Sequence, residues 1–267
     1  AKVNAARGYR APNIGELGAN GLHDGTIRYE IGDPKLKAEK SMQLDAALGI
    51  NTQHITVEFD VFSNTIQDFI FSRKLTNTSG GDSISQGYGT FQFVSGKANL
   101  LGGEIMIDIH PHPLDWLHFE NSFSYVQAVQ KEQPDSTRYL PFTPAPKIQS
   151  ELRADLNGKG KVISNTYLKI EMENFLEQNK FYSAYGTETK TPAYTLINIG
   201  AGTDIKRKTK TCCSVYLSIN NVTDVAYQSH LSRLKYAPLN YATNRSGVFG
   251  MGRNVSLKVV VPLYFKG

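Results

Sequence analysis

Cysteine is almost absent from this chain of 267 residues, and the scarcity excludes a disulfide-built protein. The only two cysteines, Cys212 and Cys213, are adjacent, which is neither a disulfide framework nor the spacing of a metal site. Neighbouring side chains on an extended strand point to opposite faces, so this pair is not placed to form a disulfide bond. We expect both thiols to be free.

Long apolar runs and a strong charge of one sign are also missing. No stretch approaches the roughly 18 consecutive apolar residues of a transmembrane helix. A membrane protein is not thereby excluded, because membrane-spanning β-strands alternate apolar and polar residues. The net charge is +5 and the basic residues are scattered, so we expect no nucleic-acid partner. The opening residues Ala1–Ala6 lack the apolar segment of a signal peptide.

Alternation with a period of two dominates what is present. In segment 41–50, Met42, Leu44 and Leu48 alternate with small or polar neighbours such as Asp45. Successive side chains of a strand point to opposite faces, so this pattern predicts β-strands, and no helical periodicity competes with it. The same alternation recurs in segments 55–61, 104–109, 148–156, 168–173, 214–220 and 254–263. The chain is therefore predicted to be all-β.

The lengths of the strands and of their links predict which kind of β protein this is. Several runs reach about nine to eleven residues, as tilted membrane strands do, whereas strands of soluble sandwiches have about 5–6. Links alternate between short and long, which is typical of outer-membrane barrels with short periplasmic turns and long extracellular loops. Short links are predicted at 49–53, 110–115, 157–160 and 206–210, and long ones at 10–38, 72–88, 127–140, 177–192 and 221–251. We predict one domain, residues 1–267, forming an antiparallel transmembrane β-barrel of about ten strands.

The same alternation predicts two faces of the sheet. The side chains expected on the convex, lipid-facing side are Met42, Leu44, Leu48, Ile105, Ile107, Leu152, Leu168, Ile170, Val215, Leu217, Leu257 and Val259. Those expected on the concave side are Asp45, Glu104, Arg153, Lys169 and Lys258. So many charges on one face suit a wetted lumen rather than a dry core.

Several short sequence boxes then occur in a fixed order along the chain. They are Arg10-Ala11-Pro12 followed by Glu16-Leu17, then Gly32-Asp33-Pro34-Lys35-Leu36, then Asn220-Asn221-Val222-Thr223-Asp224 with Tyr227, and last Gly252-Arg253 before a strand with Tyr264 and Phe265. In this order the boxes resemble those of the C-terminal part of TonB-dependent outer-membrane receptors. For Arg10, Glu16, Glu39 and Arg253 we expect interior ion pairing. Asn221 and Asp224 can bond the nearby backbone and shape a turn.

The resemblance implies the C-terminal part of a barrel of about 22 strands, the size of plugged outer-membrane transporters. Such receptors import scarce ligands across the outer membrane of Gram-negative bacteria, with energy relayed by the TonB complex through an N-terminal region. Neither a plug nor a TonB box is among the residues here, so we expect a portion of a receptor. The implied surroundings are the outer membrane and its lipopolysaccharide.

Enzyme signatures are missing from the chain. It contains no Gly-x-Ser-x-Gly, no His-Glu-x-x-His and no phosphate-binding loop. The resemblance implies a receptor and transporter for a metal chelate such as a ferric siderophore or haem, and the missing signatures favour a protein that is not an enzyme. No resident cofactor is expected, because haem or a metal chelate would be the transported ligand.

Two long loops carry candidate ligand-binding residues. The first holds His23 and Asp24 between two of the boxes, where haem receptors of the family use a histidine as an axial ligand. Zinc-uptake receptors of the family carry a similar histidine, and His with Asp suits zinc. The last loop interleaves cations with tyrosines, which suits an anionic, conjugated ligand. The predicted ligand-binding residues are His23, Asp24, Arg233, Tyr236 and Arg245, with His23 as the metal ligand.

Alternatives remain open at this point. The chain could belong to a zinc-uptake receptor, form a self-contained ten-stranded porin or adhesin, or fold as a soluble sandwich. Strands cut from a larger barrel would leave two open edges, near Ala1–Tyr9 and Asn254–Phe265, whereas a closed small barrel would pair them. The segment His110-Pro111-His112-Pro113 resembles a metal-binding tract, but prolines and histidines in a short turn explain it better.

Overall fold

A single long antiparallel sheet forms the frame of the molecule in the computed structural model, which describes residues 1–156, 162–207 and 210–263. Ten strands follow one another through it, each hydrogen-bonded to the next. They are β1 (Lys2–Arg10), β4 (Glu39–Asn51), β5 (Ile55–Lys74), β7 (Tyr88–Ile109), β8 (Leu117–Gln130), β9 (Lys147–Asp155), β10 (Ile163–Phe175), β11 (Tyr194–Arg207), β12 (Lys210–Asn220) and β15 (Asn254–Val260).

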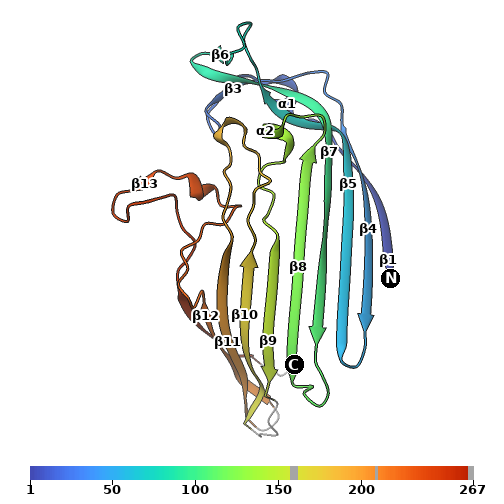
Figure 1. The fold of residues 1–267 in the computed structure, drawn as a ribbon, viewed down its shortest axis with the longest axis vertical. Helices are drawn as coiled ribbons and strands as arrows, with labels where there is room; N and C mark the ends of the chain where they lie inside the picture. The colour runs from blue at the N-terminus through green and yellow to red at the C-terminus, as the bar shows by residue number, and fades with distance from the viewer. Residues whose placement is uncertain (157–161, 208–209, 264–267) are drawn as a thin grey trace.

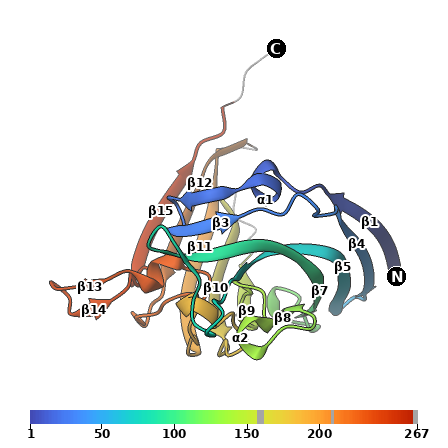
Figure 2. The same ribbon diagram turned by 90° about the horizontal axis from the view of Figure 1, so that it is seen from above.

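The sheet curves around an open interior, as Figure 2 shows from above. Short elements of the first long loop lie across this interior at one end: α1 (Ile14–Gly18), β2 (Asn20–His23) and β3 (Arg28–Ile31) (Figures 1 and 2). The prediction of an all-β chain is confirmed, with few and short helices such as α2 (Asp135–Arg138). No helix among the described residues is long and apolar enough to span a membrane.

The strand register confirms the two predicted faces. Side chains directly opposite each other on neighbouring strands share a face, and Leu48, Phe59, Ile105 and Phe123 are joined in this way across four strands. Further along the sheet, the apolar row runs through Leu152, Ile170, Ile199, Ile219 and Val255. Many of these side chains are exposed, Leu48 at 47% and Leu257 at 68%, as a lipid-facing surface requires.

Charged residues occupy the other face and pair across the strands. Lys169 Nζ lies 2.8 Å from Glu151 Oε2, and Lys147 Nζ lies 2.5 Å from Glu173 Oε1. The predicted concave residues Asp45, Glu104, Arg153, Lys169 and Lys258 all belong to this face by register. Opposite charges side by side reduce the repulsion and desolvation that unpaired charges would suffer on a concave surface.

Short and long links lie at opposite ends of the sheet, as predicted (Figure 1). The link from β4 to β5 spans only residues 52–54, and that from β7 to β8 spans 110–116. The predicted turns at 157–160 and 206–210 lie partly or wholly outside the described residues, as do Tyr264 and Phe265. Cys212 and Cys213 on β12 are both free.

The pairing of the two end strands tests whether the chain forms a closed small barrel. Within the described residues, β1 pairs only with β4 and β15 only with β12, so the sheet does not close on itself. A self-contained ten-stranded barrel is therefore wrong for this chain. A soluble sandwich is also wrong, because one sheet with strands as long as 20 and 22 residues replaces two packed sheets of short strands.

A lysine in place of Ile105 should weaken the barrel, because it puts a charge on the lipid-facing side. We expect Ile105→Lys to lower the free energy of unfolding by roughly 2–4 kcal/mol if the site lies near the bilayer centre. Denaturant unfolding of the intact receptor in lipid vesicles measures the change. Glu104→Gln, on the opposite face of the same strand, is the control. Equal stabilities for both variants would contradict the assignment of faces.

Candidate functional site

Arg10 fixes the start of the first long loop at the outer end of the sheet. Its Nη1 lies 3.0 Å from Glu16 Oε1, and its Nη2 lies 2.7 Å from Glu39 Oε1. Glu39 Oε1 also accepts from the Ile70 backbone N–H at 2.8 Å, so the ion pair ties three strands together. Asn13 caps α1 and exchanges hydrogen bonds with Glu16. The interior ion pairing predicted for Arg10, Glu16 and Glu39 is confirmed.

The boxes near the chain end have turn-forming roles. Asn221 Nδ2 donates to the carbonyls of Val225 and Met251, and Asn221 Oδ1 accepts from the Val225 N–H. Among the described residues Arg253 makes no ion pair, contrary to the prediction: its Nε donates to the Val222 carbonyl at 2.8 Å, because the turn presents a backbone oxygen there and not a carboxylate. Its own N–H donates to Asp224 Oδ1 at 2.8 Å.

The β2–β3 hairpin carries His23 and Asp24 at an exposed turn. It is held over the barrel because β3 pairs in parallel with the outer end of β7. His23 Nδ1 lies 3.2 Å from Thr26 Oγ1, which also donates to Glu30 Oε1 at 3.2 Å. Glu30 is buried and accepts from Arg28 Nε at 2.8 Å. A polar chain therefore leads from His23 into the loop interior.

That chain continues into a group of aromatic rings. The Arg28 guanidinium lies 4.7 Å from the centre of the Phe91 ring, and Phe91 meets Tyr185 edge-on at 5.1 Å. Tyr182 lies 6.2 Å from Tyr185 between ring centres. Lys74 places its ammonium 5.6 Å from the Tyr185 ring centre. The first loop, the end of β5 and the loop between β10 and β11 thus meet at one place.

A pocket of about 580 Å³ opens beside these rings at the end of the sheet that carries the long loops. Phe71, Tyr182 and Tyr185 supply aromatic walls, and Arg73 and Lys74 supply positive charge. Burial raises the pKa of Tyr182 to about 12, so its phenol stays protonated at neutral pH. The Arg73 side chain has no ion-pair partner among the described residues, whereas Lys74 Nζ lies 2.5 Å from Asp82. We refer to this feature as the mouth pocket.

Glu188 holds the loops around the mouth pocket together. Its carboxylate accepts from the backbone N–H of Phe142 at 2.7 Å and of Tyr182 at 3.0 Å, which belong to two different long loops. His230 of the last loop places Nε2 3.6 Å from Glu188 Oε1 and is almost fully buried. Burial lowers the pKa of His230, and the nearby Glu188 opposes that shift only in part.

The structure places the predicted residues of the last loop against other loops. Arg233 in η2 (Arg233–Tyr236) packs 4.7 Å from the Phe142 ring centre. The Tyr236 hydroxyl accepts from the Thr189 N–H at 2.9 Å. Arg245 in β14 (Arg245–Ser246) packs 5.1 Å from the Phe249 ring centre.

The hairpin of β14 with β13 (Leu239–Asn240) projects away from the barrel in both views (Figures 1 and 2). The structure therefore brings Arg233 to the loop between β8 and β9, Tyr236 to the loop between β10 and β11, and Arg245 to the projecting hairpin. Within the described residues, no hydrogen bond or ion pair joins these three residues to His23 or Asp24. The ligand-binding roles of all five remain predictions.

Sequence reasoning missed Tyr182, Tyr185, Glu188 and the mouth pocket. The loop that holds these residues has no period-two pattern and none of the family boxes. Two tyrosines separated by three positions between predicted strands were the only local signal. Their partners lie far along the chain, as the hydrogen bond from the Lys74 N–H to the Tyr185 hydroxyl shows.

The fold and the two faces define a class of protein: this is part of a transmembrane β-barrel that is open along one side. The family model "TonB dependent receptor-like, beta-barrel" matches residues 1–222, most of the chain. The chain belongs to the TonB-dependent receptor family, whose members are receptors and transporters of the Gram-negative outer membrane.

Solved structures with the same fold include three named metal-related proteins. The copper transporter OprC matches with a TM-score of 0.71 at 18% identity, over 96% of this chain and 36% of that one. The FrpB iron transporter from Neisseria meningitidis matches with a TM-score of 0.62 at 16% identity, over 96% and 36%. A mutant of the ferric enterobactin receptor PfeA from Pseudomonas aeruginosa matches with a TM-score of 0.61 at 17% identity, over 96% of this chain and 37% of that one. The chain thus spans little more than a third of these structures.

Removing the Glu188 carboxylate should loosen the loops of the mouth. We expect Glu188→Ala to speed amide hydrogen exchange at Phe142 and Tyr182 roughly 10- to 100-fold, since a hydrogen bond to a charged group contributes about 1.5–3 kcal/mol. Hydrogen–deuterium exchange with mass spectrometry measures it. The control is Glu177→Ala, whose carboxylate pairs with Lys190 at the surface. If amide exchange at Phe142 and Tyr182 were unchanged in Glu188→Ala, Glu188 would not be what holds these loops together.

Proposed function

We propose that the intact receptor takes up a metal chelate, such as a ferric siderophore or haem, across the outer membrane with energy relayed by the TonB complex. The mouth pocket is the observation that carries this proposal. It lies among the long loops, which face the outside in barrels of this kind, so a ligand arriving from outside meets it first. The remaining strands and the plug of the receptor complete the transport path.

The chemistry of the mouth pocket suits an anionic, conjugated ligand. Its volume of about 580 Å³ lies in the range of sites for small organic ligands, roughly 300–1,000 Å³. Tyr182 and Tyr185 offer flat faces and hydroxyl groups, and Arg73 offers a guanidinium that has no ion-pair partner within the part of the chain that the structure describes. Planar acceptor groups such as carboxylates and catecholates are bound well by arginine. The relatives named for iron, copper and ferric enterobactin support a metal-containing ligand.

His23 supports a chelate more than a bare zinc ion. Among the described residues, the only group of three side chains that could hold a metal is at the other end of the barrel and excludes His23. A free zinc ion usually takes three or four protein ligands, which the exposed turn around His23 does not gather. A chelate brings most of the ligands itself, so one histidine is sufficient to complete the coordination of its metal.

The surroundings follow from the same proposal. The apolar face meets the lipid of the outer membrane, and the basic long loops meet lipopolysaccharide. The chain acts in binding and transport and not as an enzyme, and it needs no resident cofactor. Arg233, Tyr236 and Arg245 would contact the chelate if the last loop moves over the mouth when ligand binds.

Loss of the Arg73 charge should weaken binding of an anionic chelate. We expect Arg73→Ala in the intact receptor to raise the dissociation constant of ferric enterobactin or haem roughly tenfold or more, because a charge-assisted hydrogen bond contributes about 1.5–3 kcal/mol. Titration calorimetry or quenching of intrinsic fluorescence measures this constant. The matched control is Arg207→Ala, because Arg207 ends β11 at the end of the barrel that carries the short turns, far from the mouth pocket. Equal affinities for both variants would exclude the mouth pocket as the binding site.

The role of His23 is tested by changing it to alanine. If His23 ligates the metal, His23→Ala should weaken binding of haem or of one ferric chelate about tenfold or more, and it should shift the absorption spectrum of the bound iron. Haem, Zn²⁺ and a ferric siderophore are compared side by side in the intact receptor. Asp24→Ala separates the effect of the neighbouring charge. Unchanged affinity for all three ligands would leave His23 a loop residue.

A further inference from the structure

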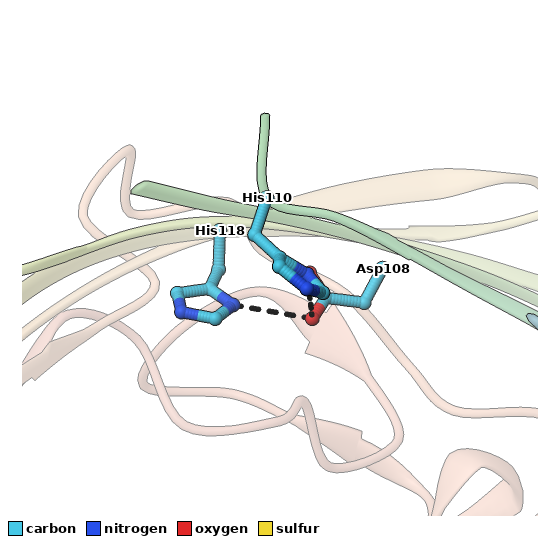
Figure 3. Close-up of side chains that lie close together, drawn as sticks. All are labelled: Asp108, His110 and His118. Atoms are coloured by element: carbon cyan, nitrogen blue, oxygen red, sulfur yellow. Dashed lines mark hydrogen bonds and ion pairs between the residues drawn. The ribbon is translucent and has the colours of Figure 1, made fainter. Parts of the chain in front are cut away.

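Four of the six histidines gather at the end of the barrel that carries the short turns: His54, His110, His112 and His118. Asp108 and His118 belong to the lumen-facing side, since Asp108 lies opposite Glu120 and His118 opposite Arg153. His110 is two residues beyond Asp108 and points the same way. Three side chains from the β7 end and the β8 start therefore converge, as Figure 3 shows.

We propose that Asp108, His110 and His118 form a binding site for a divalent transition-metal ion, with Zn²⁺ the best match, at the inner rim of the barrel. Two imidazoles and one carboxylate are a donor set that zinc prefers and that Ca²⁺ and Mg²⁺ do not. The site is distinct from the mouth pocket and independent of what that pocket binds. We call these three residues the rim triad.

The distances within the rim triad already approach those of a zinc site. Asp108 Oδ2 lies 3.1 Å from His118 Nδ1 and 3.4 Å from His110 Nδ1. The candidate ligand atoms of all three residues lie within 4.8 Å of one another. Tetrahedral zinc with bonds of about 2.0–2.1 Å keeps its ligand atoms roughly 3.3 Å apart. An ion can therefore enter with small ring rotations and no change in the strands.

Two polar atoms of the rim triad are buried without a hydrogen-bond partner among the described residues. Asp108 Oδ1 and His110 Nδ1 are buried and make no hydrogen bond within the described residues, although His110 Nδ1 lies near Asp108 Oδ2. Buried polar atoms without partners cost free energy, and most protein structures avoid them. A metal ion bound to His110 Nδ1 and to both oxygens of the Asp108 carboxylate would satisfy both atoms.

The neighbours of the rim triad fit the same assignment. His118 Nε2 lies 3.8 Å from Asp155 Oδ2, and Arg153 Nε holds Asp155 at 2.9 Å. Histidines that bind a metal through one nitrogen usually donate the other N–H to a carboxylate. Asp155 is the carboxylate on that side of the His118 ring, and a small rotation of the ring would bring the two within hydrogen-bond distance. A pocket of about 240 Å³ adjoins the triad, and it is lined by Glu120 and Glu151 as well as Asp108 and His118. It offers room for water ligands and negative charge that favours a cation.

The test compares Zn²⁺ binding by the intact receptor in detergent after treatment with a chelator. Titration calorimetry gives the stoichiometry, and Co²⁺ in place of Zn²⁺ reports tetrahedral coordination by its visible absorption. We expect the double variant His110→Ala with His118→Ala to lose one bound ion per receptor. His112→Ala, in the neighbouring turn, keeps that ion. Asp155→Asn should weaken affinity roughly 10- to 100-fold while the stoichiometry is kept.

Folding of each variant is checked by its heat-dependent mobility on gels and by chelate binding at the outer mouth. Equal Zn²⁺ stoichiometry in the wild type and a folded double variant would overturn the proposal. So would loss of the ion in His112→Ala, which would move the site to the exposed pair of His112 and Asp115, 3.3 Å apart. If the double variant does not fold, His110→Ala alone replaces it, with the same two outcomes.

Discussion

Hydrogen bonding of the backbone in a membrane is the constraint on which the rest of this structure depends. Hydrocarbon offers no partner to an N–H or C=O group, so each strand must be paired on both sides. Eight strands of the main sheet meet that requirement, and β1 and β15 meet it on one side only within the described residues. The open sides of β1 and β15 are where the other strands of a larger barrel would pair. The chain's share of about a third of its structural relatives agrees with this.

Pairing on both sides leaves the side chains only two directions, outward to lipid or inward to the lumen. The inward face carries many charges. Pairing opposite charges across neighbouring strands, as for Lys169 with Glu151, reduces the free-energy cost of desolvating them. The same rule applies where the strands end. Arg10 with Glu16 and Glu39 anchors the first loop, and Glu188 connects the loops on the far side of the mouth. Ion pairs and backbone hydrogen bonds thus position loops that have little apolar core of their own.

The two ends of the barrel carry different chemistry. The outer end combines tyrosines with cations in the mouth pocket, which suits a large, anionic, delocalised ligand. The inner rim combines imidazoles with carboxylates, which suits a small, hard-to-borderline cation. The inner rim uses strand side chains that face the lumen, and the mouth pocket uses strand ends together with the long loops that follow them. The two proposed sites therefore lie at opposite ends of the barrel and differ in their chemistry.

By itself the sequence determined the all-β class, the two faces of the sheet and the family, because each depends on local sequence patterns. Alternation with a period of two assigned Leu48 and Ile105 to lipid and Glu104 to the lumen, and the register bears this out. The Arg10 box likewise predicted its ion pairs. Only the tertiary structure decided that Tyr185 reaches Lys74, and that Asp108 and His118 join His110, which the sequence had assigned to an ordinary turn. Such sites depend on which strands lie side by side and on where long loops fold back, and no local periodicity encodes those distances.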